Sequence, residues 1–178
     1  MKTISKLACA ALVGASLLFA TATARAQTPA PKKNWTPPAN KIYGQKLVDE
    51  AMAKHPELLS ITLHGIPPGE KDIYTMFAGS YPERIGNPDD PDDIDVTRKG
   101  ITILDPRWKR VNDKDKKFVV LMPMQNANHE NIGLVVYAFK NPSRPTGMEK
   151  YYLDAAIKLR DDLASKIKSY EQMYEPAK

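Results

Sequence analysis

The spacing of apolar residues along the chain predicts three helices. Residues 41–54 carry one apolar stripe, and Asn40 is placed to cap their N-terminus. A second, short helix is predicted within 87–100, where proline and carboxylates precede a basic pair and Gly100. The third helix, over 148–174, is long and amphipathic. Its stripe consists of Tyr152, Ala155, Ala156, Leu159, Leu163, Ile167, Tyr170 and Tyr174.

Five strand candidates occupy the remainder, of which the first alternates apolar and polar residues and the second is favoured by its Tyr and Phe. They cover 58–66, 73–81, 101–104, 117–124 and 132–139. In the first strand, Leu59, Ile61 and Leu63 form one apolar face. His64 follows Leu63 and therefore points to the other face, where it would line a pocket or meet water. The turn 125–131 joins the last two strands as a hairpin. The element order favours an α+β fold, an antiparallel sheet of about five strands with helices packed on a face.

The N-terminal segment has the pattern of a bacterial-type secretory signal. Lys2 and Lys6 precede a short apolar run, and the small residues Ala24 and Ala26 flank Arg25. The run is shorter than the roughly 20 apolar residues that span a bilayer, so an uncleaved anchor is the weaker alternative. We expect cleavage after Ala26, a periplasmic or secreted protein, and no membrane span in the mature chain.

Removal of the signal during export would change the cysteine content and the net charge of the mature chain. Cys9, the single cysteine, would leave with residues 1–26, which excludes a disulfide, a thiolate nucleophile and a cysteine metal ligand. The formal net charge is +5, and loss of the three basic residues of the signal leaves 23 basic against 21 acidic residues, a charge of +2. This small excess does not indicate a nucleic-acid partner.

The mature chain is expected to form one domain behind a linker. Residues 27–40 are rich in proline and poor in apolar residues, which is typical of a flexible tether. Trp35 is the exception, either docked on the domain or exposed. We assign residues 41–178 to a single domain, with the helix 148–174 at its end.

Several short sequence segments in the middle of the chain resemble the extracellular Cache domains, which are PAS-like sensor modules. The segments are Tyr81-Pro82-Glu83-Arg84-Ile85-Gly86, Asp92-Asp93-Ile94-Asp95-Val96, Lys99-Gly100-Ile101-Thr102, Phe118-Val119-Val120-Leu121-Met122-Pro123-Met124 and Ile132-Gly133-Leu134-Val135-Val136. The resemblance covers roughly residues 41–145. It implies an exported fold that binds small molecules, such as organic acids or amino acids, between its sheet and a helical flap. Such domains usually belong to membrane receptors, whereas this chain is expected to lack a second span and an output domain.

The ligand-binding candidates come from strand phase and side-chain chemistry. A small polar ligand needs an apolar lining and a few placed polar groups. Tyr74, Tyr81 and Tyr137 offer hydroxyls, and Arg84 offers a guanidinium that reads carboxylates where the chain enters the flap. An alternative partner for Arg84 is one of the nearby aspartates. Trp108, after the third strand, would close one end of the pocket.

Metal and catalytic chemistry find weaker support. Residues 89–95 hold five aspartates but lack the glycine and glutamate spacing of an EF-hand, so carboxylates that complement a helix start explain them better than calcium does. His55, His64 and His129 have no metal-ligand spacing, and no CxxCH motif for covalent haem occurs. The sequence also lacks a G-x-S-x-G elbow and a phosphate-binding loop. We therefore predict no metal, no cofactor and no enzymatic activity.

The sequence thus favours an exported domain that reversibly binds a small metabolite, with closure of the flap 82–100 over the pocket. A membrane receptor or a second copy of the chain is a possible partner. The main alternative is an interaction protein that uses the helix 148–174 as a dimer or partner surface, if its apolar stripe is exposed. A secreted enzyme is the third hypothesis.

Overall fold

The computed structural model describes residues 31–106, 116–141 and 147–178. In this part of the chain an antiparallel five-stranded sheet is formed in the order β2-β1-β5-β4-β3. The strands are β1 (Leu58–Gly65), β2 (Thr75–Gly79), β3 (Ile103–Asp105), β4 (Lys117–Gln125) and β5 (Asn131–Lys140). The predicted α+β, PAS-like fold class is confirmed: an antiparallel sheet carries an N-terminal helix, a helical flap and a C-terminal helix.

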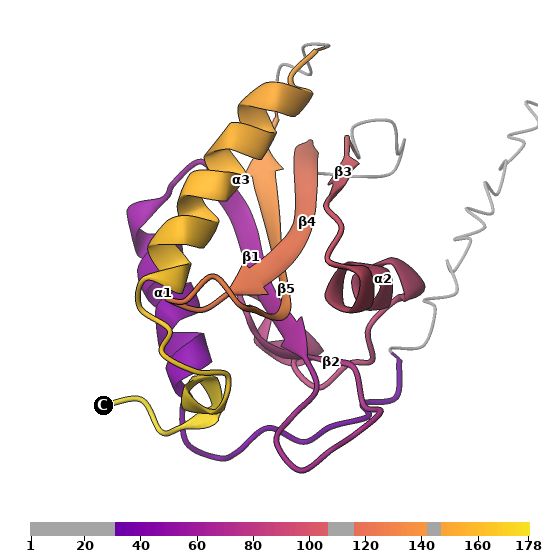
Figure 1. Cartoon of the computed structure of the whole chain (residues 1–178), viewed down its shortest axis with the longest axis vertical. Helices are drawn as coiled ribbons and strands as arrows, with labels where there is room; N and C mark the ends of the chain where they lie inside the picture. Colours follow the sequence, from indigo (N-terminus) through magenta and orange to yellow (C-terminus); the bar gives the residue numbers. More distant parts are fainter. Residues whose placement is uncertain (1–30, 107–115, 142–146) are drawn as a thin grey trace, which may run out of the picture. The chain divides into compact units, whose positions relative to one another are not determined.

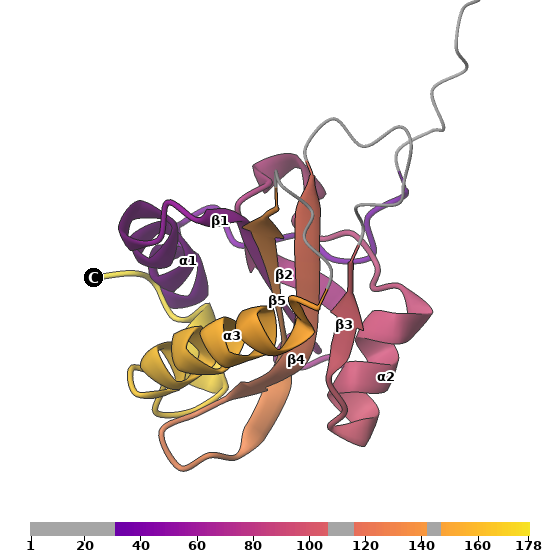
Figure 2. The same cartoon turned by 90° about the horizontal axis from the view of Figure 1, so that it is seen from above.

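Helices cover the two faces of the sheet unequally (Figures 1 and 2). Helices α1 (Tyr43–Lys54) and α3 (Glu149–Ala164) lie on one face, together with the 3₁₀ helix η3 (Glu171–Tyr174). Helix α2 (Pro91–Lys99) lies on the opposite face. It follows η1 (Pro82–Arg84), a 3₁₀ helix of one turn. None of the helices in the described residues combines the length and apolar character needed to cross a bilayer.

The two faces have separate apolar clusters. The larger cluster lies beneath α1 and α3 and includes fully buried Leu47, Leu63, Val135 and Ala156. The smaller one, beneath α2, contains Val96, Val119, Leu121, Leu134 and Ala138. This face also buries polar side chains, among them Ser60, Thr62 and His64.

The first strand departs from simple alternation at its start. The pairing of β1 with β5 shifts register between Leu58 and Ser60, as a β-bulge does. Leu58 therefore joins Ile61 and Leu63 in the larger cluster, while Leu59 packs with the cluster beneath α2. The prediction that Leu59 shares a face with Ile61 is wrong, because the extra residue of the bulge turns it to the other side.

Backbone pairing explains the start of the first helix. The helix begins at Tyr43, after Ile42, and no side chain caps it. Instead the amide of Tyr43 donates to the carbonyl of Glu175 at 2.8 Å, and Ile42 forms a bridge with Pro176. The prediction of Asn40 as N-cap is wrong, because the C-terminal segment satisfies the first amide of the helix.

The C-terminal helix is shorter than predicted. It ends at Ala164, after which Lys166 and Ile167 donate to carbonyls three residues back, the pattern of a tightening 3₁₀ turn. The chain then turns, and η3 places Tyr174 4.7 Å from Phe77 between ring centroids. Most of the predicted apolar stripe is nevertheless buried: Tyr152, Ala156, Leu159, Leu163 and Ile167 belong to the larger cluster.

The short helix predicted within 87–100 forms as α2. Asp90 and Asp93 make a reciprocal capping box, and Pro91 occupies the first turn. Gly100 ends the helix with φ +66°, a left-handed conformation that suits glycine. The loop carboxylates thus begin a helix, as the sequence pattern indicated.

The described part of the proline-rich segment contacts the domain. The amides of Asn34 and Trp35 donate to the carbonyl of Gly86 at 2.9 and 3.3 Å. Trp35 also packs edge to face with Tyr174, with ring centroids 6.0 Å apart. Of the two alternatives for Trp35, the structure therefore has the docked one.

Candidate functional site

A pocket lies between the sheet and the chain segment 82–100, which we call the flap. Its volume is about 260 Å³, and we name it the flap pocket. Strands β1, β4 and β5 supply the floor, and η1 and the start of α2 supply the walls. The lining residues are Ser60, Thr62, His64, Tyr81, Glu83, Arg84, Asp90, Asp92, Asp93, Lys117, Val119, Leu121, Val136 and Ala138.

The polar side of the floor comes from alternate residues of β1. Because side chains alternate along a strand, Ser60, Thr62 and His64 point to the flap while Ile61 and Leu63 enter the larger cluster. In the register, Thr62 lies opposite Val136 of β5. Apolar residues of β4 and β5 therefore complete the floor beside the three polar side chains.

Backbone pairing along the edge of β2 positions the flap. The amide of Gly86 donates to the carbonyl of Met76 at 2.8 Å, and the amide of Met76 donates to the carbonyl of Asn87 at 3.1 Å. Two residues later, the amide of Asp89 donates to the carbonyl of Tyr74 at 3.1 Å. Since Met76 pairs with His64, this alignment places Asp89 beside His64.

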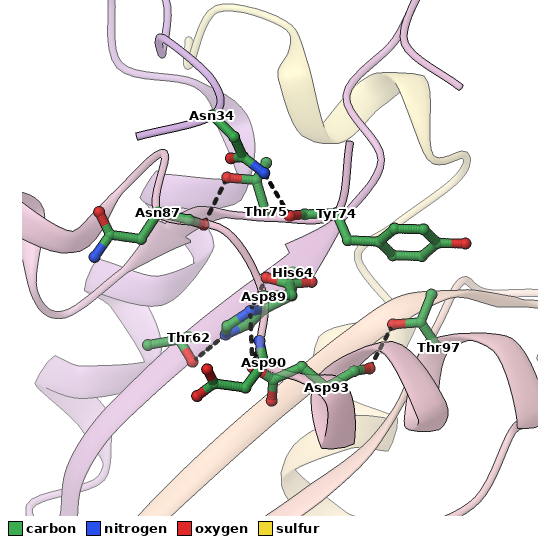
Figure 3. A network of polar contacts seen from close by, with 10 residues as sticks. All are labelled: Asn34, Thr62, His64, Tyr74, Thr75, Asn87, Asp89, Asp90, Asp93 and Thr97. Atoms are coloured by element: carbon green, nitrogen blue, oxygen red, sulfur yellow. Dashed lines mark hydrogen bonds and ion pairs between the residues drawn. The ribbon is translucent and has the colours of Figure 1, made fainter. Parts of the chain in front are cut away.

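His64 joins the floor to the flap (Figure 3). Its Nδ1 lies 2.7 Å from Oδ1 of Asp89, and its Nε2 lies 2.7 Å from Oγ1 of Thr62. An ionised carboxylate only accepts hydrogen bonds, so Nδ1 carries a proton. Nε2 then accepts from the Thr62 hydroxyl when the ring is neutral. The side chains of His64 and Asp89 are 6% and 0% exposed.

Asp93 adds a second carboxylate to this cluster. Its Oδ2 lies 3.9 Å from Nδ1 of His64 and also accepts from the amide of Asp90 at 3.2 Å. Burial raises the pKa of Asp93, and the negative charge of Asp89 adds to this effect, while His64 opposes it. The carboxylates of Asp89 and Asp93 therefore repel each other at the acidic end of the pocket.

Charges of opposite sign occupy different ends of the flap pocket. Lys117 lies opposite Lys140 of β5, whereas His64 lies opposite Leu134, six residues away along β5. At about 3.3 Å per residue this separation is roughly 20 Å along the strand. Asp90, with Asp92 and Asp93, stands at the His64 end. Lys117 is therefore a basic residue of the pocket floor that lies far from the acidic end.

Arg84 is available to a ligand. Its guanidinium lies 5.7 Å from the centre of the Tyr81 ring, and no carboxylate of the described residues forms an ion pair with it. The alternative in which an aspartate neutralises Arg84 is therefore not the arrangement found. An exposed, unpaired guanidinium on a pocket wall can bind a carboxylate in two parallel hydrogen bonds.

The structure brings two of the five predicted site residues together. Tyr81 and Arg84 both line the flap pocket. The ring of Tyr74 points away from His64 (Figure 3). Its hydroxyl accepts a hydrogen bond from Nε of Arg98 at 2.8 Å. Tyr137 is buried on the opposite face of the sheet, in the larger cluster. Trp108 lies outside the described residues.

Sequence reasoning did not select the buried cluster itself. From the sequence, Thr62 is not a candidate, Asp89 and Asp93 are considered only among the acidic residues 89–95, and His64 is expected to line a pocket or to meet water. A signal was present, since Ser60, Thr62 and His64 form a run of polar residues on one face of a strand whose other face is apolar. Polar residues in phase on a central strand favour a lined pocket over an ordinary solvent face.

His64, Asp89 and Asp93 form one of two groups in the described residues that could hold a metal ion, the other being Asp90, Asp92 and Asp93. In each group, one donor atom from every residue lies within 4.8 Å of the others. Imidazole with carboxylates suits zinc and similar divalent ions. However, Nδ1 of His64 already bonds Asp89, so a cation at this position would replace that hydrogen bond.

Comparison with known proteins gives a distant structural similarity only. No family model matches the sequence, and no curated protein matches it. The sensor domain of DcuS from E. coli is 20% identical, with a TM-score of 0.37 over 65% of this chain and 70% of that one. A GAF domain of a sensor histidine kinase from Bacillus halodurans is 15% identical, with a TM-score of 0.43 over 68% and 91%. The inducer-binding domain of the PobR transcription factor from Acinetobacter, in complex with 3-hydroxybenzoic acid, is 12% identical, with a TM-score of 0.42 over 71% and 95%. The chain is thus distantly similar in structure to PAS/GAF-like sensor domains.

Proposed function

We propose that this chain is an exported, sensor-type domain that reversibly binds a small metabolite in the flap pocket and performs no chemistry on it. The observation that carries the proposal is the pocket of about 260 Å³, on whose wall the guanidinium of Arg84 has no ion pair with any described residue. This volume approaches the range of small-molecule sites. The proposed ligand class includes organic acids and amino acids.

Among these, the charges favour an amino acid. Arg84 and Lys117 offer two positive charges, whereas Glu83, Asp90, Asp92 and Asp93 offer four negative ones. A dicarboxylate would meet repulsion from the aspartates, while a zwitterion offers one group of each sign to this mixed lining. We therefore propose that the carboxylate of the ligand binds Arg84 and that its ammonium group faces the aspartates.

The proposed mechanism is closure of the flap. A ligand that contacts both the floor and Arg84 adds interactions only when the flap lies against the sheet, so binding favours the closed form. The His64–Asp89 hydrogen bond holds the same two parts together without ligand. Binding at a hundredfold excess over the dissociation constant stabilises the closed fold by about 2.7 kcal/mol.

Export remains part of the proposal and rests on the pattern of residues 1–26. The mass of the protein recovered from the periplasm tests it directly. A chain that begins at Gln27 supports export, and a full-length chain retained in the cytoplasm contradicts it.

A thermal-shift panel tests the binding function. The panel contains the common amino acids, the matching dicarboxylates, and amines without a carboxylate. An increase in melting temperature with amino acids alone supports the zwitterion proposal, and an increase with dicarboxylates alone replaces it with an organic acid. No shift with any of them at millimolar concentration contradicts the proposed ligand classes.

One observation favours a second candidate function. The order hydroxyl, imidazole and carboxylate in Thr62, His64 and Asp89 is that of the hydrogen-bonded chain in serine-type hydrolases. In such an enzyme Thr62 would attack an acyl group while His64 accepts its proton. Incubation with an activated ester tests this: an acyl adduct on Thr62, lost in Thr62→Val, supports a hydrolase, and an unmodified chain contradicts it.

A further inference from the structure

A second cavity lies on the helix-covered face of the sheet, away from the flap. Its volume is about 200 Å³, and it is bounded by α1, α3 and the central strands. We propose that this cavity, which we call the interhelical cavity, binds a small, uncharged, mainly apolar molecule that carries one hydrogen-bond-accepting oxygen, such as a ketone. The site is independent of the function proposed for the flap pocket.

The wall of the interhelical cavity is apolar and comes from three directions. Helix α1 contributes Leu47 and Val48, and α3 contributes Leu159 and Leu163. The central strand β1 contributes the buried pair Ile61 and Leu63. A charge placed against these apolar residues, away from the charged residues at the opening, would lose its hydration without compensation, so a neutral guest is favoured in the interior. An apolar cavity of about 150 Å³ is large enough to take up benzene.

Tyr137 supplies the polar contact of this wall. The residue is 1% exposed, and its hydroxyl is buried without a hydrogen-bond partner in the described part of the chain. Burial raises the pKa of Tyr137 far above the physiological range, so the hydroxyl keeps its proton and acts as a donor. A buried donor without an acceptor is costly, and the oxygen of a guest would relieve that cost.

Charged and polar residues lie where the cavity meets solvent. The exposed members of the lining are Lys54, Asp162 and Ser165. Beside them, Nζ of Lys166 lies 3.8 Å from Oε2 of Glu50, which links the end of α3 to α1. The opening therefore lies between the two helices, and its charges remain in water while the interior stays apolar.

The test uses three probes of similar size on the purified protein. They are cyclohexanone, methylcyclohexane and cyclohexanecarboxylate, with binding measured by NMR chemical-shift titration. We expect cyclohexanone to bind most tightly and the carboxylate not to enter. In Tyr137→Phe, cyclohexanone affinity should fall about tenfold while methylcyclohexane affinity stays the same.

Two control variants test whether the probes bind in the interhelical cavity. Ala51→Leu places a larger side chain on the α1 wall and should abolish binding of both neutral probes. Arg84→Ala, in the flap pocket, should leave both affinities unchanged, so failure of the flap-pocket function does not affect this result. Equal cyclohexanone affinity in the wild type and Tyr137→Phe would overturn the proposal.

Stability provides an independent readout. Tyr137→Phe removes a hydroxyl that has no partner among the described residues, so the variant should be at least as stable as the wild type in urea unfolding. A clear loss of stability would show that the hydroxyl is already satisfied, and would likewise overturn the proposal.

Discussion

The imidazole of His64 and the carboxylate of Asp89 meet at 2.7 Å, although 25 residues separate them in the chain. One side chain stands on the central strand β1 and the other on the flap, and both are almost inaccessible to solvent. The strand and the flap are thereby held together next to the pocket. This contact adds to the backbone pairing along β2 that positions the flap.

Loss of His64 should loosen the flap and destabilise the fold. His64→Ala leaves the buried Asp89 carboxylate without its donor, and removal of one member of a buried pair costs about 3–5 kcal/mol. Urea unfolding measures the loss, and hydrogen exchange should accelerate over residues 89–97. The matched control is Lys99→Ala, which removes the exposed pair with Asp95 and should cost at most about 1 kcal/mol. Equal losses in the two variants would contradict the role of His64.

Asp93 should make stability depend on pH in the acidic range. Because burial raises the pKa of Asp93 in the folded state above 3.8, the folded chain binds this proton more tightly than the unfolded chain does. The resulting stability is fully present below pH 3.8 and is lost as the pH rises through the raised value. As the pH rises through this value, the unfolding free energy of the wild type should therefore fall relative to that of Asp93→Asn. A wild type that gains stability relative to the variant over the same interval would refute the assignment.

Gly86 should tolerate no side chain. Its φ of +87° is left-handed, and an added Cβ would collide with the backbone oxygen of Trp35. Gly69 has a similar φ of +88° but open space around it, so Gly69→Ala carries only the conformational cost of about 1–2 kcal/mol. Gly86→Ala should cost distinctly more in urea unfolding. Equal costs would show that the contact of Trp35 with the flap is not maintained in solution.

Arg84 should determine affinity without affecting stability. A charge-assisted hydrogen bond contributes about 1.5–3 kcal/mol, so Arg84→Ala should weaken binding of the best amino acid of the panel roughly 10- to 100-fold. Calorimetric titration measures the change. Arg98→Ala is the control, because this exposed guanidinium contacts Tyr74 outside the flap pocket. Loss of affinity in the control but not in Arg84→Ala would place the ligand elsewhere.

The apolar stripe of α3 should be needed for folding and not for association. Ala156 is fully buried against the sheet, so Ala156→Asp would bury an unpaired charge and should unfold the domain. Lys158→Asp introduces the same residue on the exposed face of the helix and should leave folding intact. Circular dichroism and solution mass separate the outcomes. A folded Ala156→Asp variant that loses only a dimer would favour the interaction-protein alternative.

Local patterns account for much of the fold. The strands β4 and β5 and the hairpin between them follow from two apolar runs separated by turn residues, and α2 follows from Pro91, Asp93 and Gly100. The differences arise where distant segments intervene. The Glu175 carbonyl replaces Asn40 as the partner of the first helical amide, and the bulge after Leu58 depends on pairing with β5.

The site was predictable in outline and not in detail. Strand phase and the end of the second strand indicated Arg84 and Tyr81 at the flap. The pairing of Asp89 with His64 could not be predicted, because it requires the flap to run back along the edge of β2. Tyr137 has suitable chemistry for a ligand, but its phase on β5 turns it to the helix-covered face.

The most direct test of ligand binding is an amide chemical-shift map of the wild-type protein during titration with the best amino acid. We expect the largest changes in η1, at the start of α2 and along the floor from Ser60 to His64, and a saturable change at Arg84. Changes confined to other surfaces, or none at saturating ligand, would contradict a binding site in the flap pocket.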